Sequence, residues 1–348
     1  MRLSRRQFIH QMTALGFTAA TASAMFALLS CERGQQEPSQ MSASTASPPT
    51  PYTPSIAPTT QQADSTGSST HSAPSTPTST GTYLAVARGQ SPKAMVQAAV
   101  GALGGIEQFV KAGDDVIIKP NICVAYHSYE YAATTNPEVV STLVALCKSA
   151  GARRVRVMDQ PFGGTAEEAY ARTGIGEAVR EAGGQMEIMS ALKFKATNIP
   201  NAVDIKKWPI YSDILQADVV INVPIAKHHS LARLTIGMKN LMGVVQDRNQ
   251  LHLNLGQRVA DLASVVKPSL TVVDCVRILT NHGPTGGDLD DVKLANTVIA
   301  SRDIVAADSY AATLFNLTGA DIPAVRAGAQ MGLGTMDLSG IKIEETSV

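Results

Sequence analysis

Five short runs of β-branched and aliphatic residues constrain the fold more than any other feature of this sequence. They occupy residues 115–119, 154–158, 218–223, 270–274 and 296–300. Each run is apolar on both faces, which is typical of strands in a parallel sheet that helices cover from both sides. Helical patterns with capping signals lie between them, as at Ser91-Pro92 and Asn136-Pro137. The sequence therefore predicts an α/β fold: a mostly parallel β-sheet with helices on both faces, that is, a doubly wound domain.

Polar residues follow the expected strands at the point where each strand ends. In chain order they are Lys119 and Asn121, then Asp159, then Lys227, His228 and His229, then Asp274, and after the fifth run Arg302 and Asp303. In an open parallel sheet, ligands bind beyond the carboxyl ends of the strands, where the loops converge. With all five strands taken as parallel, we expect these side chains to gather at one edge of the sheet.

The segment after the third strand, residues 226–244, carries the densest group of polar side chains. Apolar residues recur at helical spacing after Ser230, so we expect Ser230 to cap a helix that runs to about Met242. His228 and His229 would then lie at its positive end, where neutral imidazole is favoured. Neighbouring residues in an extended segment point to opposite sides, so only one His is expected to serve a site. Gly237 indicates a break or a close backbone approach.

The first 82 residues differ in composition from the rest of the sequence. Residues 1–31 contain Arg5 and Arg6 in an S-R-R-x-F-I setting and end in "LLSC" at Cys31, which resembles a twin-arginine export signal with a lipoprotein cleavage box. An uncleaved membrane anchor is the alternative. Residues 32–82 are rich in Ser, Thr and Pro and predict a disordered linker. Residues 83–348 are expected to form a single α/β domain held at a membrane of the cell envelope.

Composition narrows the classes of partner and cofactor. The chain has 29 Lys and Arg against 29 Asp and Glu, without a basic block, so no nucleic-acid partner is expected. It has 4 cysteines and no C-x-x-C motif, so neither a disulfide framework nor an intrinsic iron–sulfur cluster is indicated.

Several motifs together resemble the domain of unknown function 362 family. They are "IKPNIC", "PIAKHHSLARLTIGMKNLMGVV", "VVDCV", "GPTGG" and "VIASRDIVAADSYAA". The resemblance implies that the motif positions belong to the family's site, and it favours His228 over His229. Those positions are Lys119, Asn121, Lys227, His228, Thr235, Lys239, Asn240, Asp274 and Asp308. Many relatives carry ferredoxin-type cysteine motifs, which implies a redox protein partner, although this chain has none of these motifs.

These residue types predict an enzyme that acts on a small anionic substrate. Lys119, Lys239, Thr235, Asn121 and Asn240 would bind the substrate. His228 would act as general acid and base beside Lys227, with Asp274 or Asp159 orienting it. A divalent metal is a possible cofactor, with His228, His229, Asp274 and Asp159 as its candidate ligands and His127, His252 and Asp247 as further candidates. The alternative is a non-catalytic lipoprotein that binds a ligand or cofactor in the same pocket.

Overall fold

The structure is a computed structural model that describes residues 83–348. The predicted export signal, Cys31 and the predicted linker lie outside the described residues. Within residues 83–348, none of the helices combines the length and the apolar character that a membrane-spanning helix needs.

The fold is built on a ten-stranded, mostly parallel sheet whose main path runs β12-β1-β11-β10-β7-β2-β3-β4. β8 pairs with β10 at one side of this path and with β9, while β5 and β6 form a separate antiparallel pair. The strands are β1 (Leu84–Arg88), β2 (Asp115–Pro120), β3 (Arg154–Val157), β4 (Gln185–Met186), β5 (Phe194–Asn198), β6 (Lys207–Tyr211), β7 (Val219–Val223), β8 (Ile225–His229), β9 (Arg233–Thr235), β10 (Leu270–Leu279), β11 (Val292–Ser301) and β12 (Ile343–Ser347).

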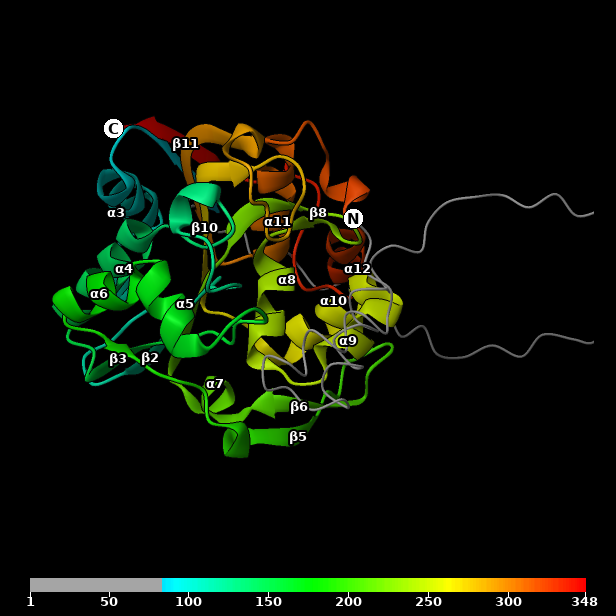
Figure 1. Cartoon of the computed structure of the whole chain (residues 1–348). Helices are drawn as coiled ribbons and strands as arrows, with labels where there is room; N and C mark the ends of the chain where they lie inside the picture. The colour runs from blue at the N-terminus through cyan, green and yellow to red at the C-terminus, as the bar shows by residue number, and fades with distance from the viewer. Residues whose placement is uncertain (1–82) are drawn as a thin grey trace, which may run out of the picture. The chain divides into compact units, whose positions relative to one another are not determined.

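Helices cover both faces of this sheet, as predicted, with α3, α4 and α6 on one side and α8, α10, α11 and α12 on the other (Figure 1). The helices are α3 (Pro92–Ala102), α4 (Pro137–Ser149), α5 (Ala166–Arg172), α6 (Ile175–Glu181), α7 (Ser212–Gln216), α8 (Gly237–Asn240), α9 (Arg248–Leu251), α10 (Leu255–Val266), α11 (Ile304–Thr313) and α12 (Pro323–Gln330).

The strand sequences explain the two layers of helices. Successive side chains of a strand point to opposite faces, so a strand that is apolar throughout needs cover on both sides. In β2, Val116 and Ile118 pack into the core under α3, α4 and α6, whereas Ile117 packs into the core on the other face. The predicted caps are confirmed, because the side chains of Ser91 and Asn136 accept backbone N–H groups at the starts of α3 and α4.

Two expectations about the local fold are wrong. The fifth predicted strand, β11, is antiparallel to β10, and Ser301 at its end pairs with Thr271 near the start of β10. Arg302 and Asp303 therefore lie beside the amino ends of the parallel strands, on the opposite side of the sheet from their carboxyl ends.

The helix expected to begin at Ser230 is instead a β-hairpin followed by a short helix. β8 and β9 pair through Lys227 and Thr235, and Arg233 adopts a positive φ of 64°. The helix starts only at Gly237. A Cβ at Gly237 would lie 2.6 Å from Asp308 Oδ1, so the glycine permits the close backbone approach that was one of its two expected roles.

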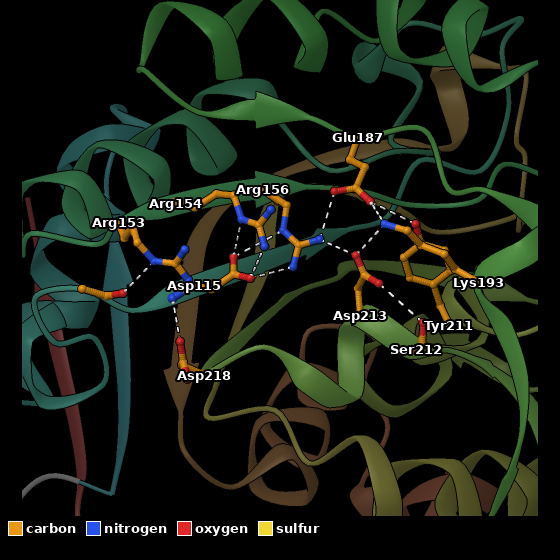
Figure 2. Close-up of polar contacts among 11 residues, drawn as sticks. Asp115, Arg153, Arg154, Arg156, Glu187, Lys193, Tyr211, Ser212, Asp213 and Asp218 are labelled. Atoms are coloured by element: carbon orange, nitrogen blue, oxygen red, sulfur yellow. Dashed lines mark hydrogen bonds and ion pairs between the residues drawn. The ribbon is translucent and has the colours of Figure 1, made fainter.

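A network of charged side chains joins the start of the parallel strands to the β5–β6 pair (Figure 2). Asp115 in β2 binds both Arg154 and Arg156 of β3. The Arg156 guanidinium also binds Glu187 and Asp213, at 3.0 and 2.6 Å. One buried guanidinium is thus shared by carboxylates from three parts of the chain, a role that suits its planar array of N–H donors.

Candidate functional site

The strand order reverses between β2 and β7, and a cavity of about 770 Å³ opens beyond this point. Helices lie on opposite faces on either side of such a switch point, which leaves a crevice at the carboxyl ends of the two central strands. Lys119 near the end of β2 is in register with Asn222 near the end of β7. The cavity is lined by residues after β2 and β3, by the β8–β9 hairpin, by α8 and by the segment 242–252.

A chain of buried amides ties the strand ends to α8. Asn240 donates to Asn222 Oδ1 at 2.8 Å and to the carbonyl of Lys119 at 3.1 Å. Its own Oδ1 accepts from Lys119 Nζ and from Asn121 Nδ2, both at 3.0 Å. Asn222 in turn donates to the carbonyl of Gly237. The short helix α8 is therefore held against the sheet by hydrogen bonds that use every polar group of the Asn240 amide.

Lys119 forms a buried ion pair at the back of the cavity. Its Nζ lies 2.7 Å from Asp159 Oδ1, and both side chains are almost completely shielded from solvent. Asp159 also accepts the backbone N–H groups of Ile122 and Gln160. Burial lowers the pKa of Lys119, and the Asp159 carboxylate opposes that shift. The pair positions the two loops that follow β2 and β3.

Strand periodicity decides which groups of β8 face the cavity. Lys227 and His229, two residues apart, both line it, whereas His228 does not. Lys227 Nζ is buried and donates to Ala133 O at 2.6 Å, to Asn121 Oδ1 at 3.0 Å and to Cys123 Sγ at 3.4 Å. No carboxylate of the described residues forms an ion pair with it.

His229 is a neutral ring with a defined tautomer. Its Nδ1 accepts the backbone N–H groups of Leu231 and Ala232, at 3.1 and 3.2 Å, so the ring proton is on Nε2. Burial lowers its pKa to about 3, and the charges of Lys239 and Lys227 add to that effect. The ring stacks on His252 with 6.4 Å between centroids. His229 can therefore donate a hydrogen bond through Nε2 at neutral pH without carrying charge.

Among the cations that line the cavity, Lys239 has the fewest neighbouring groups that stabilise its charged form. Burial lowers its pKa to about 7, with further contributions from Lys227 and Arg248, and Cys123 opposes the shift. Its Nζ contacts Met242 Sδ at 3.6 Å, and no carboxylate in the described part of the chain pairs with it. A lysine in this state exchanges its proton near neutral pH.

A fourth cation and two unpartnered oxygens complete the cavity wall. Arg248 donates to the carbonyls of Gln160 and Pro161, at 2.8 and 3.4 Å, and these hydrogen bonds hold its guanidinium in the wall of the cavity. Thr235 is 3% exposed, and its Oγ1 and the Oε1 of Gln160 are buried without a hydrogen-bond partner. Buried polar atoms are rarely left unpaired, and both of these residues line the cavity, so the two oxygens are free to hydrogen-bond to a molecule inside it.

Most of the predicted site residues are brought together, but His228 and Asp274 are not among them. The shared cavity brings together Lys119, Asn121, Lys227, His229, Thr235, Lys239 and Asn240, with Asp159 behind Lys119. His228 Nδ1 instead accepts the backbone N–H of Gly283. Asp274 is buried and accepts the N–H groups of Asn136 and Val276, and burial raises its pKa to about 6.

Of the predicted metal ligands, His229, His252 and Asp247 line the cavity, whereas His228 and Asp274 do not. Within residues 83–348, no three His, Cys, Asp or Glu side chains are grouped as a metal site requires. Asp308, another motif residue, accepts the N–H groups of Gly237 and Met238 at the start of α8. A bound divalent metal stays a prediction, which metal analysis of the purified protein would check.

Sequence reasoning missed Arg248, Gln160 and Cys123 as parts of the cavity wall. Arg248 lies in a segment without periodic pattern, and its position depends on carbonyls of a loop 88 residues away in sequence. Cys123 follows the first strand closely and could have been found by extending the strand-end argument by two residues.

Comparisons with known proteins agree with the motif resemblance. The profile of the family described as Domain of unknown function (DUF362) matches residues 116–313. A thylakoid-associated protein of Synechocystis, sll1697, is 28% identical over 246 residues, which cover 66% of this chain and 72% of that protein. The lactate racemase apoprotein of Thermoanaerobacterium thermosaccharolyticum has a TM-score of 0.40 and 12% identity over 65% of this chain. The matched region spans only 55% of the racemase chain.

Proposed function

This chain belongs to the domain of unknown function 362 family, and on that premise we propose that it is an enzyme acting on a small anionic substrate in the cavity between the ends of β2 and β7. One observation carries the proposal: Lys119, Lys227, Lys239 and Arg248 line one cavity, and Asp159 is the one buried carboxylate paired with any of them among the described residues. An anionic ligand would supply the missing negative charge.

The same cavity offers groups for proton transfer. A general base works best when its pKa lies near the working pH, and the Lys239 pKa of about 7 meets that condition. The neutral His229 ring can donate from Nε2, and the free Thr235 hydroxyl can donate or accept. We assign the reactive amine to Lys239 and the binding of the substrate's anionic group to Arg248.

Anion binding is tested by calorimetric titration with phosphate and with small carboxylates. Arg248→Gln should weaken binding about tenfold or more, because it removes a charge-assisted hydrogen bond worth about 1.5–3 kcal/mol. Arg302→Gln is the matched control: Arg302 also donates to a backbone carbonyl, but it lies at the opposite edge of the sheet. Equal effects of both variants, or no binding by the parent protein, would contradict the proposal.

Turnover separates the enzyme from a carrier. Molecules retained by the purified protein are identified by mass spectrometry and then followed by NMR during incubation with fresh protein. We expect conversion by the parent protein and none by Lys239→Met, with Lys207→Met, which alters an exposed lysine, as control. A retained molecule that both proteins leave unchanged would support the binding-protein alternative.

We further propose that the domain is exported by the twin-arginine route and attached to a membrane through a lipid on Cys31. The sequence of residues 1–31 supports this, and the thylakoid-associated relative supports attachment to a membrane. Cys31→Ser should move the protein from the membrane fraction to the soluble fraction. Continued membrane attachment of that variant would favour the apolar segment itself as the anchor.

A further inference from the structure

The three lysines of the cavity differ in how their ammonium groups are satisfied. A lysine ammonium has three N–H donors. Lys119 Nζ has three oxygen partners: Pro120 O at 2.8 Å, Asn240 Oδ1 at 3.0 Å and Asp159 Oδ1 at 2.7 Å. Lys227 Nζ also has three partners, two oxygens and the Cys123 sulfur. Both amines therefore use all three of their N–H donors within the protein.

Lys239 Nζ is different because its hydrogen-bond partner is the Met242 thioether, at 3.6 Å. A thioether is a weak acceptor, so it supports the charged form of the amine poorly. Two positively charged neighbours, Lys227 and Arg248, line the same cavity. Desolvation and nearby cations are the conditions that turn a lysine into a nucleophile, because its nitrogen then keeps its lone pair near neutral pH.

We propose that the substrate is a small oxo acid and that Lys239 forms an imine with its carbonyl carbon. The inference rests on the proposed function, since the carboxylate of the oxo acid is the anion that the cavity would bind. Arg248 uses two of its five N–H donors on loop carbonyls, which leaves others to bind this carboxylate.

The chemistry balances without a further reactant. The Lys239 lone pair forms a bond to the carbonyl carbon, the carbonyl π pair moves to oxygen and takes a proton, and the nitrogen loses one. This carbinolamine then loses its hydroxyl as water after a second proton transfer, which leaves the C=N bond.

The unpartnered Thr235 hydroxyl is placed to assist this loss of water. Thr235 lines the cavity with Lys239 and is paired in register with Lys227. Its buried Oγ1 can hydrogen-bond to the carbinolamine oxygen, which would satisfy an atom that otherwise lacks a partner.

The test is reductive trapping of the purified protein with pyruvate and cyanoborohydride at pH 7, followed by intact mass measurement and peptide mapping. We expect the mass of one N-carboxyethyl group per chain, located at Lys239. The labelling rate at Lys239 should exceed that at exposed Lys207 about 100-fold, because a far larger fraction of Lys239 is deprotonated. Lys207→Met should leave the labelling at Lys239 unchanged.

Lys239→Arg keeps a cation but has no amine that can form the imine, so it should lose the label. Pyruvate protection against thermal unfolding reports on binding separately. Protection without a label at Lys239 overturns the imine and leaves the proposed anion site standing. Absence of both protection and label, together with no binding of phosphate, overturns the proposed function as well. Equal labelling of Lys239 and Lys207 also refutes the inference.

Discussion

Replacing Lys239 by methionine should stabilise the fold at neutral pH, and that advantage should shrink at alkaline pH. The folded protein buries this ammonium beside Lys227 and Arg248, and only the Cys123 sulfur opposes the resulting fall in pKa. Methionine has a similar length and carries no charge. The variant therefore removes the cost of burying the charge while keeping most of the contacts of the side chain.

The pKa of Lys239 sets both the size and the sign of this effect. The fall from 10.5 to about 7 corresponds to at most about 5 kcal/mol, at about 1.36 kcal/mol per pKa unit. Because the side chain keeps partial contact with solvent, we expect about 2 kcal/mol at pH 7 or below. Between about pH 7 and 10.5 the folded state releases the proton and the unfolded state keeps it, so the parent protein gains stability with rising pH.

The difference in the free energy of unfolding between parent and variant is measured by urea denaturation at about pH 6.5, 7.5, 8.5 and 9.5, which span this window. Taking the difference cancels the titration of every other group. The advantage of Lys239→Met should fall by about 1 kcal/mol between pH 7 and pH 9. Lys207→Met, at an exposed site, should give a difference that does not change with pH. A flat curve for Lys239→Met would refute the reasoning about the buried amine.

Two further predictions concern the scaffold of the site. Gly243→Ala should destabilise the fold by about 3 kcal/mol in urea denaturation, because the new Cβ would collide with Asp159 Oδ1 and lie 2.5 Å from Lys119 Nζ. Gly101→Ala, where a Cβ meets nothing within 4 Å inside a helix, should instead stabilise it by about 0.5–1 kcal/mol, and similar effects of the two changes would contradict the prediction. Burial raises the pKa of Asp308 to about 7, so its stabilising contribution is full below about pH 4 and is lost as the pH rises through 7. The unfolding free energy of the parent protein relative to Asp308→Asn should fall over that range, by up to about 4 kcal/mol, and a constant difference would be evidence against it.

Local sequence patterns were sufficient to predict most of the strands and helices that form the layers of this fold. Continuous apolar runs such as that of β2 identify strands that need cover on both faces, and capping residues such as Ser91 and Asn136 identify helix starts. The direction of β11 could not be predicted in this way, because the apolar pattern of a strand is the same whether the strand is parallel or antiparallel to its neighbour. The direction of β11 is set by its antiparallel pairing with β10.

The β8–β9 hairpin shows where helical spacing misleads. Apolar residues at 231, 234 and 238 fit one face of a helix, but Leu231 is 66% exposed at the turn of the hairpin. Strand alternation from Lys227 would have selected His229 for the cavity side, whereas the family resemblance favoured His228. The position of Arg248 depends on carbonyls of a distant loop, which no local pattern reveals.

The amide chain through Asn240 divides the wall of the cavity into two kinds of residue. Lys119 and Asn240 line the cavity with the same atoms that fasten α8 to the sheet, so a change in either would disturb folding along with the shape of the cavity. Lys239, Arg248 and His252 make fewer such bonds and sit on short helical turns. Directed evolution toward a new substrate should therefore accumulate its accepted substitutions between residues 239 and 252, while the strand ends stay as they are.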